Sequence, residues 1–332
     1  MTNRNDARLI ALDWGTTSCR AYLMAEGGVV LAERRQPLGT MAVTRHASAT
    51  GTPHVLAFEQ SFEEICGGWL ESDPDLPVIA CGMVGSNHGW AEADYRAVPA
   101  DLVSEGIVLT RVSTRRGVTV HIIPGLIADS ALPGVMRGEE TQILGVLTAN
   151  LRAGTLDYAS ERIVLLPGTH SKWVRIIGTT VKDFATYMTG EIYALLTTDS
   201  TLSRLSVRPV QSDWMAFDRG LDVARSPAGR GGVLNTAFSA RSLVITGELA
   251  PDQVEDYISG LLIGHELAEI DPAWLADEPN AILLCGEAAL NDRYRRALQR
   301  LGVDVDLAVP GSAPLGMWEI AQITGLLTLV KQ

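Results

Sequence analysis

Two short turns in this sequence carry the residue types that bind a phosphate chain. The first, Asp13-Trp-Gly-Thr-Thr-Ser18, follows an apolar run and leads into an alternating one. Gly15 lets a ligand approach the backbone, and the N–H groups and hydroxyls of Thr16, Thr17 and Ser18 can donate to an anion. The Asp13 carboxylate is placed to meet a cation. The pattern indicates a metal-nucleotide site, although Asp, Gly and Thr also form ordinary hairpin turns.

A second turn in the other half of the chain repeats this plan. It reads Leu166-Pro-Gly-Thr-His-Ser-Lys172, so that Gly-Thr-x-Ser recurs at Gly168, Thr169 and Ser171, with His170 inside the turn. Apolar runs typical of strands flank both copies. The chain therefore reads as two related halves, each built around one turn.

The elements that must position these turns follow the same order in both halves. The first half reads as a hairpin over residues 9–23, a strand over 29–33, a loop over 39–43, an amphipathic helix over 55–69, and strands over 77–82 and 118–123. The second half reads as a hairpin over 163–176, a strand over 181–187, helices from 189 and over 254–267, strands over 281–286 and 303–309, and a closing helix over 320–330. Gly260 and Gly264 allow the helix over 254–267 to pack closely. The irregular stretch 200–247 is interpreted as a lid or an insertion.

Two further stretches carry polar side chains at element ends. The Gly-rich segment Met83–Trp90 follows a buried strand, where α/β proteins place ligands, although it also suits an ordinary connection with Trp90 packed on the lobe. Glu139 and Glu140 open a helix, where the helix dipole favours carboxylates whether or not they have a chemical role. Both stretches are candidates for substrate contacts.

The bulk composition narrows the class of protein. The chain has 332 residues, 46% of them hydrophobic and 20% charged, which is ordinary globular composition and is long enough for two cores. A net charge of −12 argues against a nucleic-acid or anionic-membrane surface, because both depend on clustered Lys and Arg. No apolar run reaches the ~18 residues of a membrane span. We therefore expect neither a nucleic acid nor a membrane as partner.

The N-terminal residues and the cysteines indicate a compartment. Met1–Arg8 is polar and lacks the apolar core of a signal peptide. Four scattered cysteines in apolar surroundings read as buried free thiols in a reducing environment: Cys19, Cys66, Cys81 and Cys285. We expect a cytoplasmic protein.

The order and spacing of three loops resemble the actin-like ATPase superfamily, which includes many sugar kinases. Asp13–Ser18 resembles its first phosphate loop, Leu166–Ser171 its second, and Leu284-Cys-Gly-Glu-Ala-Ala289 the loop that holds adenosine. The resemblance implies an α/β fold of two duplicated ribonuclease-H-like lobes with a cleft between them. We place the first lobe, on the sugar-acid side, at 1–137 with the C-terminal helix completing it, and the second, on the ATP side, at 138–332.

Four blocks are more closely similar to the 2-dehydro-3-deoxygalactonokinase family. They are Asp13–Arg20, Gly82–Trp90, Arg137-Gly-Glu-Glu-Thr-Gln142 and Leu166–Trp173. The resemblance implies phosphorylation of 2-dehydro-3-deoxy-D-galactonate by ATP at its terminal hydroxyl. The product would be the 6-phosphate that an aldolase consumes in galactonate catabolism. A homodimer is left open.

The resemblance also implies roles for individual residues. Asp13 would hold Mg²⁺ through water, and Glu139 or Glu140 would be the base, since neutral-sugar kinases have an Asp near this helix start. The sugar acid would meet Ser86, Asn87 and Trp90, while its carboxylate partner is not identified. ATP would be bound by residues of the three loops: Gly15, Thr16, Thr17, Ser18, Gly168, Thr169, His170, Ser171, Lys172, Gly286, Glu287 and Ala288. Arg20 and Lys172 serve equally well as structural strand residues.

Three rival functions use the same features. Another sugar or sugar-acid kinase of the superfamily would keep both turns and change only the acceptor. A phosphohydrolase of the exopolyphosphatase kind would use water as nucleophile, and the negative net charge counts against its long anionic substrate. A nucleotide-gated binding protein would keep the phosphate turns without a base. The sequence contains no GxxxxGK[ST] phosphate loop.

Overall fold

The structure is a computed structural model that describes residues 6–129, 132–155, 161–270, 274, 282–308 and 312–328. The chain divides into two compact units, one comprising 1–159, 177–183 and 309–332 and the other comprising 160–176 and 184–308. Three residues at the limits of predicted elements lie outside the described residues: Ala281, Val309 and Val330. Among the described helices, none combines the length and apolarity needed to cross a membrane.

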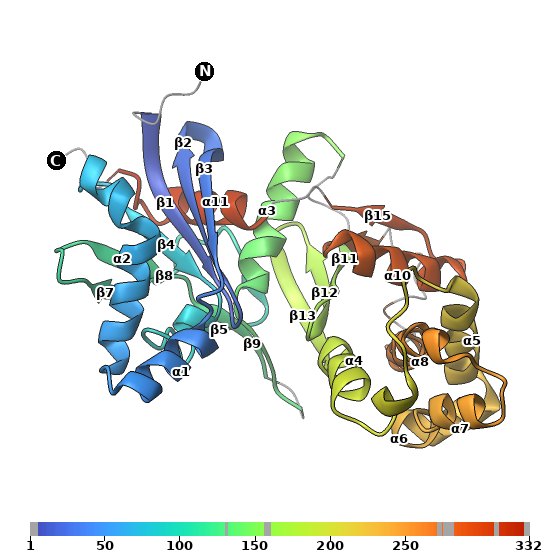
Figure 1. The fold of residues 1–332 in the computed structure, drawn as a ribbon. Coiled ribbons are helices and arrows are strands. Elements are labelled where there is room, and N and C mark those ends of the chain that lie inside the picture. The colour runs from blue at the N-terminus through green and yellow to red at the C-terminus, as the bar shows by residue number, and fades with distance from the viewer. Residues whose placement is uncertain are drawn as a thin grey trace. The chain divides into compact units, whose positions relative to one another are not determined.

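The sheet of unit 1 has the strand order β3-β2-β1-β4-β8-β7 (Figure 1). Antiparallel pairing joins β1 to β2 and β2 to β3, whereas β4 is parallel to both β1 and β8. The five neighbouring strands β3, β2, β1, β4 and β8 therefore have the order and directions of a ribonuclease-H-like sheet. Their bounds are β1 Ala7–Trp14, β2 Cys19–Ala25, β3 Val29–Gln36, β4 Val78–Cys81, β7 Thr110–Ser113 and β8 Thr119–Ile122.

Side-chain alternation along β1 separates an aromatic core from the polar end of the strand. Ile10, Leu12 and Trp14 face a core that includes Phe58 and Phe62 of α2 (His54–Ser72). Residues of opposite parity point to the other face of the sheet, so Asp13 lies on that face. The helices of this unit are α1 Thr40–Thr50, α2, α3 Glu139–Arg152 and α11 Ser312–Ile323, with 3₁₀ turns η2 Glu26–Gly28 and η3 Met83–Gly85.

Two glycines let α3 and α11 pack with their backbones in contact. A Cβ added to Gly145 would overlap the carbonyl of Ser312, and one added to Gly316 would overlap the carbonyl of Thr141. Because α11 also contacts β1, this crossing holds the first turn of α3 near the end of β1. Both α3 and α11 therefore belong to unit 1. The lobe boundary predicted after residue 137 stays a prediction.

A small sheet of order β10-β9-β5 completes unit 1. It brings Tyr95 of β5 into register with Gly125 of β9, and β10 ends at the residue before Arg137. Sequence patterns missed these strands because each is only three or four residues long. Their bounds are β5 Tyr95–Ala97, β9 Gly125–Ala128 and β10 Gly134–Met136.

Unit 2 repeats the strand order of unit 1. Its sheet runs β15-β14-β11-β12-β13, with β11 parallel to β14 and β14 parallel to β15. The connections from β11 to β12 and from β12 to β13 are too short for a parallel crossover, so these pairs are antiparallel. The predicted duplicated α/β fold is confirmed. The strands are β11 Glu161–Leu166, β12 Ser171–Ile177, β13 Thr180–Tyr187, β14 Ile282–Leu284 and β15 Val305–Leu307, with β6 Ala100–Asp101 pairing with the start of β13 inside unit 1.

The helices of unit 2 are α4 Thr189–Thr198, α5 Trp214–Arg225, α6 Gly232–Thr236, α7 Ser239–Ile245, α8 Val254–Glu269 and α10 Ala288–Gln299, with 3₁₀ turns η4 Ser203–Leu205, η5 Pro227–Gly231 and η6 Pro251–Gln253. The prediction of close packing at Gly260 is confirmed, because an added Cβ would overlap the Phe217 carbonyl of α5. Phe217 and Leu221 of α5 belong to the core of unit 2. The interpretation of residues 200–247 as a lid or an insertion stays a prediction.

Two other predicted elements differ from the structure. Residues 39–43 were expected to form a loop, but α1 begins at Thr40; its Thr- and Ala-rich sequence lacks a clear apolar stripe, so periodicity could not reveal it. The closing helix, expected over 320–330, spans Ser312–Ile323 instead. Gly325, with φ at +71°, ends it in the left-handed conformation that favours glycine, and Pro314 is tolerated in its first turn.

We expect Gly316→Ala to destabilise unit 1 by about 2 kcal/mol or more, because the added methyl forces α3 and α11 apart. Urea denaturation followed by circular dichroism measures this. Gly106→Ala is the matched control, since its Cβ would meet only Ser104 Oγ at 3.4 Å and its stability should change by less than about 0.5 kcal/mol. Equal stability of the two variants would contradict the close crossing.

Candidate active site

The first phosphate turn is fixed by its own hydrogen bond and by the start of a helix. The Gly15 amide donates to the Ser18 carbonyl at 3.0 Å. The first two amides of α1 donate to the carbonyls of Gly15 and Thr16, at 3.0 and 3.2 Å. Gly39 lies so close that an added Cβ would overlap the Thr16 carbonyl. The carbonyls of the turn are thus satisfied from behind, and Gly15, Thr16 and Ser18 are half-buried while Thr17 is exposed.

Asp13 stands at the end of β1, beside the end of the parallel strand β4. It is in register with Cys81, and its carboxylate lies 3.8 Å from the Arg20 guanidinium. Burial raises the pKa of Asp13 above its usual value; Arg20 opposes this change and the Glu139 charge adds to it. Glu139 is thus close enough to influence Asp13. The two carboxylates predicted for metal binding and base chemistry therefore belong to one cluster in unit 1.

Two glycines with positive φ bring this cluster together. Gly82, with φ at +90°, follows β4, and an added Cβ would lie 2.9 Å from the Trp14 carbonyl. Gly138, with φ at +105°, precedes α3, and its Cβ would lie 3.0 Å from the Gly82 Cα. Three chain segments consequently meet with backbones in near contact, which places the start of α3 beside the end of β1.

The two glutamates of α3 have different surroundings. Glu140 is 3% exposed and accepts hydrogen bonds from the Gly138 amide at 2.6 Å and the Thr141 hydroxyl at 2.8 Å. Burial is the main cause that raises its pKa to about 7, and the adjacent Glu139 charge adds to this. Glu139 is half-buried and accepts from the Arg137 amide at 3.0 Å. Glu139 is therefore the more accessible of the two.

The predicted substrate residues lie around η3 with unequal exposure. Asn87 is exposed, whereas Ser86 is 7% exposed and its hydroxyl donates to the Met83 carbonyl at 2.8 Å. Trp90 packs in the aromatic core against Trp14 and Phe62. Asn87 is thus the member of this set that a ligand can reach without rearrangement.

The second phosphate turn is fixed in the same way by α4. The Glu191 amide donates to the Thr169 carbonyl at 2.9 Å, and a Cβ added to Gly190 would overlap the Gly168 carbonyl. The His170 imidazole contacts the Glu191 carboxylate at 2.5 Å. Thr169 and His170 are exposed and Gly168 is half-buried. The accessible part of this turn therefore consists of these three residues.

A buried carboxylate anchors the exit of the second turn. Glu266 of α8 accepts hydrogen bonds from Trp173 at 2.7 Å, from the Tyr294 hydroxyl at 2.6 Å and from Thr189. The Tyr294 hydroxyl also contacts the Ser171 hydroxyl at 2.7 Å. Burial raises the pKa of Glu266 above its usual value, and its three donors oppose this change. Ser171 and Lys172 are buried in β12, so these predicted ATP contacts lie beneath the turn.

The predicted adenosine loop lies against the second phosphate turn. A Cβ added to Gly286 would be 3.2 Å from the Pro167 carbonyl, and the Cys285 amide donates to the Leu165 carbonyl at 2.8 Å. Glu287 caps α10 by position, Ala288 begins that helix, and all three residues of the set are exposed. The structure thus places the loop that contains Gly286, Glu287 and Ala288 against Pro167, the residue before Gly168.

Neither turn glycine is demanded by the fold. Gly15 and Gly168 do not have positive φ, and added Cβ atoms would come no closer than 3.7 and 4.0 Å to other atoms. The fold alone would accept alanine at these two positions, yet both turns have glycine. The missing side chain leaves room for a ligand to approach the backbone. This space, next to exposed amides and hydroxyls, fits a phosphate chain.

The carboxylates also fit a magnesium site completed by a ligand. Within the described ranges, no group of three or more His, Cys, Asp or Glu side chains could hold a metal ion alone. Mg²⁺ is commonly held by one or two carboxylates, phosphate oxygens and water, and Asp13 with its neighbour Glu139 offers such oxygens. The protein could thus supply part of an octahedral shell but no complete cage.

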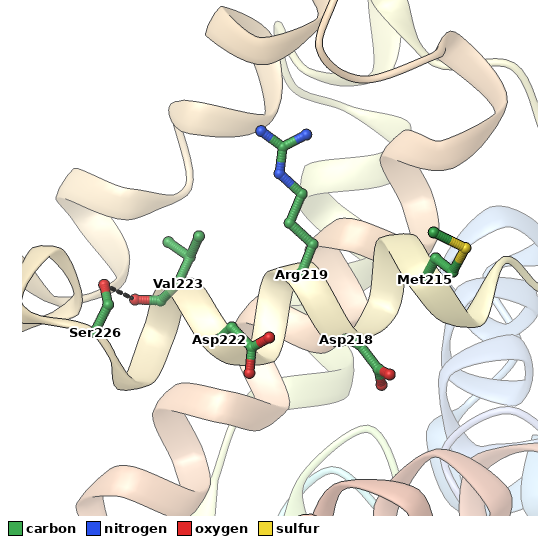
Figure 2. A pocket seen from close by; sticks show the side chains of 6 residues that line it. All are labelled: Met215, Asp218, Arg219, Asp222, Val223 and Ser226. Carbon is green, nitrogen blue, oxygen red and sulfur yellow. Dashed lines mark hydrogen bonds between the residues drawn. The ribbon is translucent and has the colours of Figure 1, made fainter.

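A pocket of about 510 Å³ lies elsewhere, along α5 in unit 2 (Figure 2). Asp218 and Asp222, on its wall, form ion pairs with Arg296 and Arg300. The other lining residues are Met215, Arg219, Val223 and Ser226. None of the predicted site residues lines this pocket, so we assign it no role in the site.

Sequence reasoning missed the residues that support the turns. Gly39 precedes α1 and Gly190 lies in the first turn of α4, and amides of both helices donate to the turn carbonyls. Glu266 anchors β12 from a distant helix. The signal for the glycines was present as Gly39-Thr40 and Thr189-Gly190, one such pair after each hairpin. No local pattern identifies Glu266, since its partners come from three other elements.

Comparison with known proteins agrees with this arrangement. The family model described as 2-keto-3-deoxy-galactonokinase matches residues 13–320. The chain belongs to this family. It is 36% identical to the 2-dehydro-3-deoxygalactonokinase of Escherichia coli (strain K12), over 90% of this chain and 92% of that protein. It is 34% identical to the probable 2-dehydro-3-deoxygalactonokinase of Rhizobium meliloti (strain 1021), over 89% and 90%.

The chain is also similar to a solved structure. This crystal structure of a candidate 2-dehydro-3-deoxygalactonokinase from Sinorhizobium meliloti superposes with a TM-score of 0.74 at 32% identity. The likeness covers 95% of this chain and 98% of the other. The family match therefore extends from sequence to fold over nearly the whole chain.

The two kinds of glycine should respond differently to alanine. We expect Gly15→Ala and Gly168→Ala to keep their thermal midpoints but to weaken ATP binding at least about tenfold, because the methyl occupies ligand space. Gly39→Ala and Gly190→Ala should lower the thermal midpoint, since their methyl groups overlap turn carbonyls. Calorimetric ATP titration and thermal melts measure the two effects. Unchanged ATP affinity in both turn variants would contradict the phosphate assignment.

The raised pKa of Glu140 predicts a pH-dependent contribution to stability. Its pKa rises from 4.5 to about 7 on folding, so the folded state binds more protons between these values. The stabilisation is fully present below pH 4.5 and is lost as pH rises through about 7. The free energy of unfolding of Glu140→Gln, relative to that of wild type, should therefore increase by up to about 3 kcal/mol between pH 5 and pH 8. Urea denaturation at both pH values tests this, with the exposed Glu92→Gln as control; equal pH profiles for both variants would contradict it.

Proposed function

We propose that this protein transfers the terminal phosphoryl group of ATP to the 6-hydroxyl of 2-dehydro-3-deoxy-D-galactonate, a step of galactonate catabolism. The observation that carries this proposal is the family match over residues 13–320, together with relatives of that name at 34–36% identity. The duplicated Gly-Thr-x-Ser turns, each with a glycine that the fold does not require, support ATP as the donor. Phosphoryl transfer needs mainly positioning and electrostatic stabilisation, which such turns supply.

The proposed binding residues follow from their exposure. Gly15–Ser18 in unit 1 and Gly168–His170 in unit 2 would donate backbone and hydroxyl hydrogen bonds to phosphate oxygens. Gly286–Ala288 would contact adenosine beside the second turn. Ser171 and Lys172, buried in β12, would support that turn from below. Each proposed role therefore rests on which atoms the fold leaves accessible.

We further propose Mg²⁺ as the metal, with Asp13 holding it through water. When bound, Mg²⁺ would neutralise the charge that develops on the phosphate oxygens. Arg20, at 3.8 Å, keeps a positive charge beside Asp13 without burying it in a tight pair. Cytoplasmic location belongs to the same proposal, supported by four cysteines that form no disulfide, three of which are buried. Whether two copies associate is a separate question for light scattering.

Glu139 is the proposed base. It is more accessible than Glu140 and lies near Asp13, whereas both Glu140 oxygens already accept hydrogen bonds from the start of α3. Glu140 would then be a positioning residue that holds Gly138 and Thr141. Asn87 would contact the hydroxyls of the acid, Ser86 could join it only after its hydroxyl leaves the Met83 carbonyl, and Trp90 would support η3 from the core.

An ADP-release assay with Mg²⁺ and the keto acid tests the function. We expect ADP to form only with the acceptor, and ³¹P NMR to identify the 6-phosphate. Acceptor-independent ADP would indicate a phosphohydrolase, and ATP binding without turnover would indicate a binding protein. Glu139→Gln should lower kcat by roughly 10²–10⁴-fold while ATP affinity is kept, and Glu140→Gln should retain most of kcat. The opposite order of the two variants would assign the base to Glu140.

A further inference from the structure

Arg137 is a buried cation with donors that no described residue accepts from. Its side chain belongs to a residue that is 7% exposed, and its Nη2 donates to the Ala93 carbonyl at 2.7 Å. Its Nε and Nη1 are shielded from solvent and have no hydrogen-bond acceptor among the described residues. Arginine remains charged in proteins, so these are charged donors without partners.

The described surroundings of Arg137 hold the guanidinium without a carboxylate in an ion pair with it. Its Nη1 lies against Gly85, where an added Cβ would be 3.0 Å away. The Tyr95 ring covers the guanidinium, with its centroid 4.2 Å from Cζ, and Tyr95 itself is 38% exposed. One residue that solvent reaches therefore lies directly over this buried charge.

A second arginine shows the usual solution for such a charge. Arg293 in unit 2 also lies over an aromatic ring, and its Nη1 likewise has no acceptor among the described residues, but the buried Asp256 carboxylate pairs with its charge at 2.5 Å. In the described part of the chain, Arg137 has a backbone carbonyl and an aromatic ring in place of a carboxylate. Leaving buried charged donors unpaired is costly, and such groups are commonly completed by an ion or a ligand.

The position of Arg137 indicates which ligand that is. Its backbone amide donates to Glu139, the proposed base, and its guanidinium lies beside Gly85, the residue before Ser86. It thus joins the proposed acceptor-hydroxyl end of the site to the segment proposed to bind the sugar acid. A planar guanidinium with several N–H groups is suited to grip both oxygens of a carboxylate.

We propose that Arg137 binds the carboxylate of the sugar-acid substrate and that Tyr95 moves aside to admit it. The inference rests on the proposed function and adds the residue that selects an acid over a neutral sugar. The carboxylate would supply the acceptors that Nε and Nη1 lack. Gly85 is required because a side chain there would displace the guanidinium.

The test compares the keto acid with its neutral carboxamide, which has the same shape. Wild type should prefer the acid by roughly 10²-fold or more in kcat/KM, because the amide leaves the buried cation unpaired. In Arg137→Gln this ratio should fall towards one, mainly through a higher KM for the acid, with ATP affinity unchanged. Arg137→Lys keeps the charge and should retain part of the preference for the acid over the carboxamide. It provides the test if Arg137→Gln does not fold.

Arg96→Gln is the matched control. Arg96 is half-buried in the same small sheet, and its Nη2 also donates to a backbone carbonyl, that of Asp101, at 2.7 Å. It should keep the wild-type ratio of acid to amide. An unchanged ratio in the Arg137 variants, a lack of acid preference in wild type, or weaker ATP binding as the main defect would overturn the assignment. Failure of wild type to phosphorylate the keto acid at all would instead overturn the proposed function.

Discussion

The contact between each phosphate turn and the helix behind it is the constraint on which both units depend. When the amides of a turn face a ligand, its carbonyls point the other way and need hydrogen-bond donors from the rest of the protein. The first amides of α1 and α4 have no partners within their helices, so they meet this need. The approach is so close that only glycine fits at Gly39 and Gly190. The same solution in both units shows that the duplication includes the support of the turns as well as their sequence.

Backbone proximity also organises the carboxylates of unit 1. Gly82 and Gly138 let the ends of β1, β4 and the start of α3 meet without intervening side chains. Asp13, Glu139 and Glu140 are consequently crowded together, and burial with mutual repulsion raises the pKa values of Asp13 and Glu140. Close packing of α11 through Gly316 holds the helix that carries two of them. Bringing these charges together costs stability. A metal ion or a proton that binds among them relieves the repulsion, so the crowding favours a site for either.

The two units treat buried charge differently. In unit 2, Glu266 has three side-chain donors, and Asp256 pairs with the charge of Arg293 although one nitrogen of that guanidinium has no acceptor among the described residues. In unit 1, Arg137 has two such nitrogens and no described carboxylate in an ion pair with it, beside the segment that follows β4. A satisfied buried charge rigidifies a structure, whereas an incomplete one is available to a ligand. This difference separates the residues that maintain the fold from those that could select a substrate.

Sequence patterns were enough to predict the duplicated halves, the order of most strands along the chain and the two turns, because alternation, apolar periodicity and Gly-Thr-x-Ser spacing are local properties. It also indicated the Asp13, Glu139 and Glu140 set and the close packing at Gly260. It could not reveal α1, whose stability comes from the turn it contacts, nor the short strands around Tyr95, which depend on neighbouring strands. Three features became visible in the folded structure alone: Trp90 lies in a core, Glu139 is more accessible than Glu140, and Arg137 has donors that no described residue accepts from. Burial and hydrogen-bond completion arise from segments distant in the chain, so no local pattern of residues encodes them.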